Sequence, residues 1–329
     1  MSSPSVVLDL GTFMCNIGFA GEEEPKISFH TEDVADGAFK NRVIVDLEKW
    51  KQLVSYCYKA LNVEPSAQPL FLVDSTTFNL EKRKSVAKYL FEDLKIPSLY
   101  IASSFTYAGF LIQKTNCLIV DMGEAATEIC AFCEDNVNRG TLLRSAVTGR
   151  TISEYLARIL KCNDQKTIWN VKSNLLECPH FADIDAKMEE AVTNRVDYNG
   201  INFGPERVIA STAYLRPFFL EIDSNGLAVD IKDVIVKCPI NFRKDMWTHV
   251  VLIGGSAQIK GFAIALQEAL VELAPEAVKP DVHVSVAEKP QIASWIGASA
   301  YAAAKPNAAV LKTDYDTEGD KILQDHLMN

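Results

Sequence analysis

The chain has 329 residues, of which 48% are hydrophobic and 23% charged, and its formal net charge is −10. This length allows two compact domains with separate cores, at roughly 100–200 residues each. The acidic balance excludes a broad nucleic-acid surface, which needs clustered Lys and Arg to displace counterions. The chain has no basic start followed by an apolar stretch, and no apolar run that could span a bilayer. We therefore expect a cytosolic or nuclear protein.

The first predicted element is a buried strand that runs into a tight turn. Residues 6–10 read Val-Val-Leu-Asp-Leu, and Gly11-Thr12 follow. Farther along, residues 47–61 place seven apolar or aromatic side chains on one helical stripe, and Asp46 is suited to cap the start of this helix.

The middle of the chain continues with alternating strands and helices. A short buried strand is expected at 70–73 and an amphipathic helix at 80–95. Residues 118–124 then read Leu-Ile-Val-Asp-Met-Gly-Glu, which repeats the pattern of residues 6–12. Two matching copies more than a hundred residues apart indicate a weak internal duplication.

The second half of the chain follows the same alternation. An amphipathic helix is expected at 151–161, where Thr151 and Glu154 have the spacing of a capping box. Residues 250–256 form a third buried strand that ends in paired glycines, and a helix is expected at 261–273. Strands that alternate with helices predict an α/β fold.

The eight cysteines lie scattered in apolar segments, at positions 15, 57, 117, 130, 133, 162, 178 and 238. Cys130 and Cys133 form a CxxC pair, but on a predicted strand they point to opposite faces, and no second pair completes a zinc site. We expect free and mostly buried thiols.

The three glycine turns suit a phosphate clamp. Glycine lets backbone N–H groups approach anionic oxygens, and a carboxylate at each of two strand ends, here Asp9 and Asp121, can hold a hydrated magnesium ion. A helix N-terminus after Gly254-Gly255 would add its dipole. The alternative is that the three strand ends are unrelated.

Longer stretches resemble actin. Residues 9–21 look like its first phosphate loop, with the downstream Gly-Phe-Ala-Gly, and residues 118–150 run without a gap along its second phosphate region. Residues 238–255 match the stretch leading into its adenosine site, and Ser294-Trp295-Ile296-Gly297 matches the segment near its second hinge. The resemblance covers nearly the whole chain.

This resemblance implies two ribonuclease-H-like domains around a nucleotide cleft. The expected first domain is 1–111 with 300–329, and the second is 112–299 with a smaller insertion at about 150–205. ATP or ADP with magnesium would be held by Asp9, Gly11, Thr12, Asp121, Gly123, Glu124, Gly149, Gly254, Gly255 and Ser256, with Asp9 and Asp121 binding the metal through water. Two interpretations stay open: binding of nucleotide without hydrolysis, or glycines that serve only the backbone turns.

Departures from actin predict that fast ATP hydrolysis is lost. Asn16 stands where actin carries a phosphate-binding lysine, and Phe13 replaces a second loop glycine. Ser104 aligns with the glutamine that orients the attacking water, and Glu128 aligns with a nearby histidine. Because several transition-state contacts are missing together, we expect no actin-type ATPase activity.

A second departure concerns an insertion. Residues 28–45 span the position at which actin carries its small outer subdomain, and only Thr31–Arg42 serves as connection. A chain without that subdomain cannot accept a further subunit at its pointed end in actin's manner. Its opposite face would bind partners through Phe110, Leu111, Cys133, Asn136 and Tyr301. The alternative for Phe110 is an ordinary core position.

The combination most resembles the divergent actin-related subunit that caps the pointed end of the actin-like minifilament of dynactin. Ile96-Pro97-Ser98 and Cys238-Pro239-Ile240 agree with it locally. Expected partners are the filament subunits and the other pointed-end subunits, in the cytoplasm and cytoskeleton and without self-polymerisation. The alternatives are a nuclear actin-related subunit of a chromatin-remodelling complex and a working ATPase.

Overall fold

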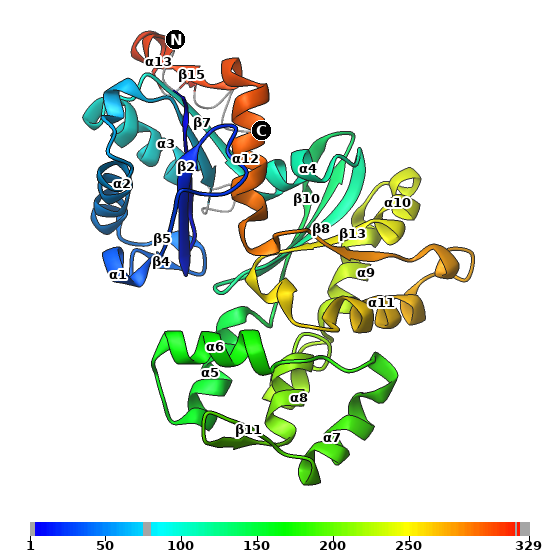
Figure 1. Ribbon diagram of the computed structural model, residues 1–329. Helices are drawn as coiled ribbons and strands as arrows, with labels where there is room; N and C mark the ends of the chain where they lie inside the picture. The colour runs from blue at the N-terminus through cyan, green and yellow to red at the C-terminus, as the bar shows by residue number, and fades with distance from the viewer. Residues whose placement is uncertain (1–3, 75–79, 320, 323–329) are drawn as a thin grey trace. The chain divides into compact units, whose positions relative to one another are not determined.

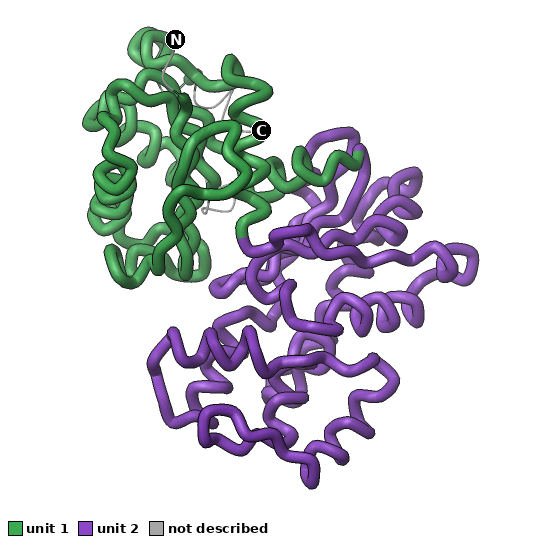
Figure 2. The backbone as a smooth tube through the Cα atoms, viewed as in Figure 1, with its two compact units in different colours: residues 1–114, 292–329 green, residues 115–291 purple. Residues whose placement is uncertain are grey.

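The structure is a computed structural model in which residues 4–74, 80–319 and 321–322 are described (Figure 1). It divides into two compact units (Figure 2): unit 1 comprises residues 1–114 and 292–329, and unit 2 comprises residues 115–291. Residues 112–114 and 292–299 were expected in the second domain but group with unit 1. Residues 293–299 begin helix α12 (Ala293–Ala304), whose Trp295 donates a 3.2 Å hydrogen bond from Nε1 to the carbonyl of Val7.

Unit 1 is built on a six-stranded sheet in the order β15-β7-β6-β1-β2-β3, in which β1, β6 and β7 are parallel. Its strands are β1 Val6–Leu10, β2 Met14–Phe19, β3 Ile27–His30, β6 Leu70–Asp74, β7 Ser98–Ser103 and β15 Val310–Leu311. Its helices besides α12 are α1 Glu32–Ala35, α2 Leu47–Leu61, η1 Pro65–Ala67, α3 Leu80–Lys88, the π-helix η2 Tyr89–Asp93, α4 Ser104–Ile112, η9 Pro306–Ala308 and α13 Lys312–Glu318.

Side chains of β1 alternate between two apolar layers, one on each face of this sheet. Val6 and Leu8 pack in the cluster that contains Trp50 of α2, whereas Val7 packs in the cluster that contains Trp295 of α12. The predicted helix at 47–61 is confirmed, and Asp46 caps it by accepting a hydrogen bond from the backbone N–H of Lys49.

Unit 2 is built on a five-stranded sheet in the order β10-β9-β8-β13-β14. Its strands are β8 Asn116–Met122, β9 Thr127–Cys133, β10 Asn136–Ser145, β13 Val250–Ile253 and β14 Val284–Val286, with a separate hairpin of β11 Val196–Tyr198 and β12 Ile201–Phe203. Its longer helices are α5 Gly149–Leu160, α6 Gln165–Leu175, α7 Ile184–Thr193, α8 Pro205–Thr212, α9 Leu227–Lys237, α10 Arg243–Thr248 and α11 Phe262–Leu273. Short helical turns are η3 Phe181–Asp183, η4 Pro217–Leu220, η5 Ile240–Phe242, η6 Gly255–Gln258, η7 Lys279–Asp281 and, at the junction with unit 1, η8 Pro290–Ile292.

The capping of α5 differs from the prediction. The helix begins at Gly149, and its N-cap is Thr148, whose side chain pairs reciprocally with Thr151. Thr151 is therefore the third helical residue and not the cap. The sequence pattern misplaced the start because Thr148 and Thr151 both have side chains that suit this position.

Five strands of the unit 1 sheet repeat the topology of the unit 2 sheet, and β15 is an additional antiparallel edge strand. In each sheet the first strand begins an antiparallel meander of three strands, β1-β2-β3 or β8-β9-β10. On its other side it pairs with a parallel strand, β6 or β13, which pairs in turn with the parallel strand β7 or β14. The two copies of the Asp-x-Gly pattern end β1 and β8. The predicted duplication is thus confirmed as a repeated fold.

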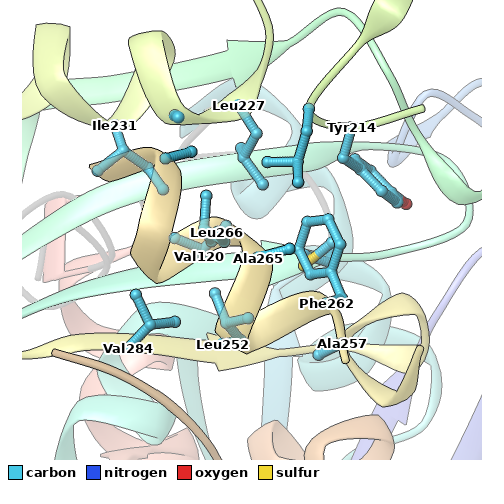
Figure 3. Packing of buried hydrophobic residues seen from close by; sticks show 14 of the residues in the cluster. Val120, Tyr214, Leu227, Ile231, Leu252, Ala257, Phe262, Ala265, Leu266 and Val284 are labelled. Carbon is cyan, nitrogen blue, oxygen red and sulfur yellow. The ribbon is translucent and has the colours of Figure 1, made fainter. Parts of the chain in front are cut away.

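The core of unit 2 packs helices against one face of its sheet (Figure 3). Val120 of β8 and Leu252 of β13 lie against Leu266 of α11, and Leu227 and Ile231 of α9 enter the same cluster. This core fixes the ends of β8 and β13, from which two of the predicted loops leave.

The segment between β3 and α2 is short. Residues 31–46 contain α1 and a hairpin of two-residue strands, β4 Phe39–Lys40 and β5 Val43–Ile44. The turn of this hairpin consists of Asn41 and Arg42, both in the left-handed region with φ of 51° and 64°.

Candidate functional site

The first predicted loop is the turn between β1 and β2 in unit 1. The N–H of Gly11 donates to the carbonyl of Met14 at 3.1 Å, and the Thr31 hydroxyl donates to the carbonyl of Gly11 at 2.7 Å. Asp9 lies opposite Asn16 in the ladder of these two strands. The Thr12 hydroxyl is buried and has no hydrogen-bond partner among the residues that the structure describes. A buried hydroxyl of this kind suits a bound polar ligand, because leaving it unsatisfied is costly.

Two departures from the actin pattern have structural roles in unit 1. Asn16 is 4% exposed, and its Oδ1 accepts a 2.8 Å hydrogen bond from the Ser28 hydroxyl on β3. Phe13 packs edge-on against His30, with ring centroids 4.8 Å apart. Both side chains therefore contact residues of strand β3.

Ser104 is the first residue of α4 and follows directly after β7. It is 2% exposed, and its hydroxyl accepts a 3.2 Å hydrogen bond from Nη2 of Arg42 at the tip of the β4–β5 hairpin. No local pattern distinguishes Arg42 in the sequence, because Lys40 and Arg42 both flank Asn41.

The second predicted loop joins β8 to β9 in unit 2 and is held against the start of α5. The N–H groups of Gly149 and Arg150 donate to the carbonyls of Gly123 and Glu124 at 3.0 and 2.7 Å. The structure therefore brings together Gly123, Glu124 and Gly149. The first amides of α5 already have partners within the unit.

Lys172, which no local sequence pattern marks, fixes this loop. Nζ of Lys172, from α6, lies 2.9 Å from the Glu124 carboxylate, 3.0 Å from the carbonyl of Gly149 and 3.0 Å from the hydroxyl of Ser153. The Ser153 hydroxyl also donates to Glu124 at 2.8 Å. The Glu124 carboxylate is thus bound by Lys172 and Ser153.

Glu128 was expected to add negative charge near a developing phosphate. It is 1% exposed, and its carboxylate accepts a 2.7 Å hydrogen bond from Nε of Arg144 on the neighbouring strand β10. Its charge is therefore paired within the sheet of unit 2.

The third predicted loop follows β13. Gly254 has φ of +89°, and a Cβ there would lie 2.7 Å from the carbonyl carbon and oxygen of Met122, so only glycine fits beside the end of β8. Space around Gly255 is open, since a Cβ there would meet nothing within 4 Å. The loop thus lies against the second loop, with room for a ligand at its next residue.

Ser256, in the same loop, is itself buried in unit 2. Burial raises the pKa of Tyr214, and the neighbouring hydroxyls of Ser256 and Thr127 oppose that rise. Tyr214 lies at the edge of the apolar cluster (Figure 3). No local pattern in the sequence marks Tyr214 or Thr127, because their positions depend on tertiary packing.

The two predicted magnesium carboxylates occupy equivalent places in the two units. Asp9 on β1 pairs with Val73 on β6, and Asp121 on β8 pairs with Ile253 on β13. Asp121 is 7% exposed. Among the described residues, no group of three or more His, Cys, Asp or Glu side chains could hold a metal ion by itself.

Three of the predicted partner-binding residues cluster in unit 1. Phe110 and Leu111 on α4 are half-buried, and the Phe110 ring lies edge-on to Tyr301 of α12 with centroids 5.2 Å apart. The Lys305 ammonium lies over both rings, 5.7 and 5.1 Å from their centroids. Phe110, Leu111, Tyr301 and Lys305 are called the aromatic patch below.

The remaining two predicted partner residues lie in unit 2, at the β9–β10 turn. Asn136 is exposed, and its Nδ2 donates to the carbonyl of Glu134 at 2.7 Å. Cys133 is buried in the apolar core, and burial raises the pKa of its thiol. The prediction that Cys133 contacts a partner at the surface is wrong, because its side chain lies on the face of β9 that packs into the core. All eight cysteines are free, and all but Cys162 are buried.

No helix in the described part of the chain is both long and apolar enough to cross a membrane. A model of the actin protein family matches residues 32–199 and 185–327, which together cover most of both units. The repeated sheet topology and the glycine turns at the ends of β1, β8 and β13 agree with this match. The chain belongs to the actin family.

Proposed function

We propose that this chain is a non-catalytic structural subunit that caps the pointed end of an actin-like filament. The observation that carries the proposal is the short segment between β3 and α2, which contains a four-residue helix and one small hairpin. Filament growth needs two complementary faces on every subunit, because the contact is heterologous and repeats. A subunit that lacks the outer subdomain of actin offers one face, and propagation stops there.

Loss of hydrolysis is supported by three side chains. Asn16 is bonded to Ser28, Ser104 accepts from Arg42, and Glu128 is paired with Arg144. None of these groups orients a water molecule as glutamine does or neutralises a phosphate as lysine does. Each missing transition-state contact costs about 2.7–4 kcal/mol, so several together leave little turnover.

Members of the actin family usually bind a nucleotide with magnesium. Retention of nucleotide without hydrolysis is supported by the buried and unsatisfied Thr12 hydroxyl and by the open space at Gly255. The residues that would hold the nucleotide are Asp9, Gly11 and Thr12 within unit 1 and Asp121, Gly123 and Ser256 within unit 2. Bound magnesium would offset phosphate charge.

Partner binding would use the aromatic patch of unit 1. Half-buried aromatic rings that can become fully desolvated on contact are typical anchors of protein interfaces. Phe110 and Tyr301 meet this description, and Lys305 adds a positive charge at their edge. The filament subunit below the cap would supply the complementary surface.

The assembly we propose is dynactin, where the chain would support dynein-driven transport in the cytoplasm. The local stretches Ile96-Pro97-Ser98 and Cys238-Pro239-Ile240 support this choice. Affinity purification followed by mass spectrometry tests it. Recovery of dynactin components supports the proposal, whereas recovery of a chromatin-remodelling ATPase would assign the chain to the nuclear alternative.

Pelleting and end-labelling with purified minifilament test the capping activity directly. We expect stoichiometric binding at one filament end and no self-assembly at any concentration that polymerises actin. Binding along the filament sides, or filaments formed by this chain alone, would refute the cap.

A further inference from the structure

The end of α9 in unit 2 presents apolar side chains to solvent. Among the described residues, the most exposed large apolar side chain is Ile240, the first residue of η5, at 82%. Val236, in the last turn of α9, is 53% exposed, and Pro239 between them is exposed as well. Val236, Pro239 and Ile240 are called the η5 patch below. Single exposed apolar side chains are ordinary on a protein surface, so the surroundings of the patch decide its meaning.

The exposure of Ile240 is fixed by its neighbours on both sides. Cys238, which is 1% exposed, and Phe242 pack in the apolar core of unit 2. The backbone N–H of Phe242 donates to the carbonyl of Pro239 at 3.0 Å, which closes the turn. Because the core holds this turn at both ends, Ile240 cannot face inward unless Cys238 or Phe242 leaves the core.

The side chain of Arg243 fastens the same turn to α9. Its Nη2 donates to the carbonyl of Val236 at 2.7 Å, and its Nε donates to the carbonyl of Cys238 at 2.9 Å. Carbonyls at the end of a helix lack a donor within the helix, and here one arginine satisfies two of them. Since the turn is fixed before any contact forms, binding through Ile240 loses little conformational entropy.

The charge around the η5 patch is opposite to that of the whole chain. Residues 236–244 contain Lys237, Arg243 and Lys244 and no carboxylate, whereas the chain has a net charge of −10. Lys237 is exposed, and the Lys244 side chain is 68% exposed, with its Nζ 3.5 Å from Asp281. An apolar protrusion with basic residues beside it fits a partner surface that has an apolar recess and carboxylates at the rim.

The patch is also connected to a turn that carries a predicted partner contact. Asn116, at the start of β8, accepts a 3.0 Å hydrogen bond from the N–H of Glu134 in the β9–β10 turn and donates to the Asp245 carboxylate of α10 at 2.8 Å. Asn136, which is predicted to contact a partner, follows Glu134 in that turn, and α10 directly follows η5. The β9–β10 turn and the η5 patch therefore lie at one end of unit 2.

We propose that the η5 patch is the unit 2 part of the surface by which this chain binds a filament subunit. This inference rests on the proposed capping function and adds a second anchor to the aromatic patch of unit 1. Ile240 enters an apolar recess of the filament subunit, and Lys237 and Lys244 face carboxylates at the rim of that recess. Anchors that become fully desolvated dominate affinity, whereas charges at the rim act mainly on association.

Binding of the full chain to purified minifilament ends, measured over a range of salt concentrations, tests the proposal. We expect Ile240→Asp to weaken binding at least about tenfold at every salt concentration and to unfold at the same temperature as the wild type, because the side chain is exposed. The double variant Lys237→Glu with Lys244→Glu should associate more slowly, with a weaker dependence on salt. Ile264→Asp and Lys260→Glu, at exposed positions elsewhere in unit 2, are the matched controls and should bind as the wild type does.

Carbodiimide cross-linking of the same complex maps the contact independently, because this reagent joins an amine directly to a neighbouring carboxylate. Mass spectrometry should find Lys237 or Lys244 joined to an Asp or Glu of the filament subunit. Wild-type affinity of Ile240→Asp, or the absence of such cross-links from both lysines, would overturn the inference and leave the capping function standing. A wild-type chain that does not bind filament ends would refute the capping function and this inference with it.

Discussion

Asp74 at the end of β6 and Arg83 on α3 form a buried ion pair in unit 1. Nε and Nη2 of Arg83 both lie 2.8 Å from Oδ2 of Asp74. The Asp74 side chain is 3% exposed and the Arg83 side chain is 1% exposed. The pair joins the carboxyl edge of the sheet, where Thr12 and Ser104 also lie, to a helix that follows it. The pair therefore connects the end of β6 to α3 within unit 1.

Removing one partner of this pair should be strongly destabilising. We expect Arg83→Ala to lower the free energy of unfolding by about 3–5 kcal/mol, because it leaves the Asp74 carboxylate buried without its partner. Urea unfolding followed by circular dichroism measures the loss. Lys84→Ala, at the next residue, removes an ion pair whose Glu81 partner is exposed, and it should cost less than about 1 kcal/mol.

The double variant Asp74→Leu with Arg83→Met distinguishes an unpaired charge from lost packing. Apolar side chains of similar volume often replace a buried pair at little cost. We therefore expect the double variant to recover most of the stability lost by Arg83→Ala. If both variants are equally unstable, the lost packing of the two side chains, and not the unpaired charge, causes the destabilisation.

ATP turnover should not exceed that of actin monomers. Ser104 and Glu128 have hydrogen-bond partners in Arg42 and Arg144 and do not replace the groups that activate water in actin. Phosphate release from the purified chain, with filamentous actin measured in the same buffer, checks this. A rate comparable to that of filamentous actin would contradict the loss of catalysis.

Nucleotide retention should depend on both strand-end carboxylates. Asp9→Ala and Asp121→Ala are each expected to release bound nucleotide during gel filtration, because each carboxylate is proposed to hold the hydrated magnesium that accompanies the phosphates. Glu23→Ala and Asp223→Ala, exposed acidic positions in units 1 and 2, serve as controls and should retain it. Retention by both strand-end variants would refute the clamp, and an empty wild type would favour glycines that serve only the turns.

A histidine in unit 2 should titrate above its usual range. Nδ1 of His180 lies 2.6 Å from a carboxylate oxygen of Glu268 on α11, and this hydrogen bond raises the pKa of His180 above its ordinary value of 6.5. Since protonated His180 is favoured in the folded state, its contribution to stability is complete below about pH 6.5 and is lost as the pH rises through the raised pKa. NMR titration of His180 measures the shift.

Glu268→Gln should return His180 towards its ordinary pKa, because the amide keeps the shape of the carboxylate and removes its charge. Glu272→Gln, one turn farther along α11, is the matched control and should leave the titration of His180 unchanged. An unshifted His180 in the wild type would show that the pair is not formed in solution.

The loops could be predicted from the sequence, whereas most of the contacts that surround them could not. Asp9-Leu10-Gly11 and Asp121-Met122-Gly123 could be identified because a buried strand, a carboxylate and a glycine turn are all local patterns. The repeated topology followed from them. The start of α5 was misplaced because two threonines three residues apart compete for the cap.

The missed residues are partners that reach a predicted position from a distant part of the chain. Arg42 contacts Ser104 over 62 residues, Lys172 contacts Glu124 over 48, and Arg144 contacts Glu128 over 16 across a strand pair. Nothing in the spacing of one sequence specifies such pairs. Cys133 was assigned to the surface for a related reason, since the turn beside it is exposed but its own side chain faces the core.

Replacing Phe110 by Asp should release the chain from filament ends while its fold stays intact. Phe110 is half-buried against Tyr301, so the substitution removes an apolar anchor without emptying a closed core. Lys305 lies over the same ring and can pair with the new carboxylate. End-binding by co-pelleting measures the loss, and circular dichroism checks the fold. Phe218→Asp, at a ring that is 59% exposed in unit 2, is the control and should still bind.

A second variant keeps this test decisive if Phe110→Asp unfolds, which would identify Phe110 as a core residue. Lys305→Glu reverses the charge at the aromatic patch, and Lys305 is exposed, so its replacement leaves the apolar packing of unit 1 in place. Because charges at the edge of an interface act mainly on association, we expect slower binding to filament ends and a weaker dependence on salt. If Lys305→Glu and Phe110→Asp both bind as the wild type does, the aromatic patch is not the surface by which this chain joins a filament.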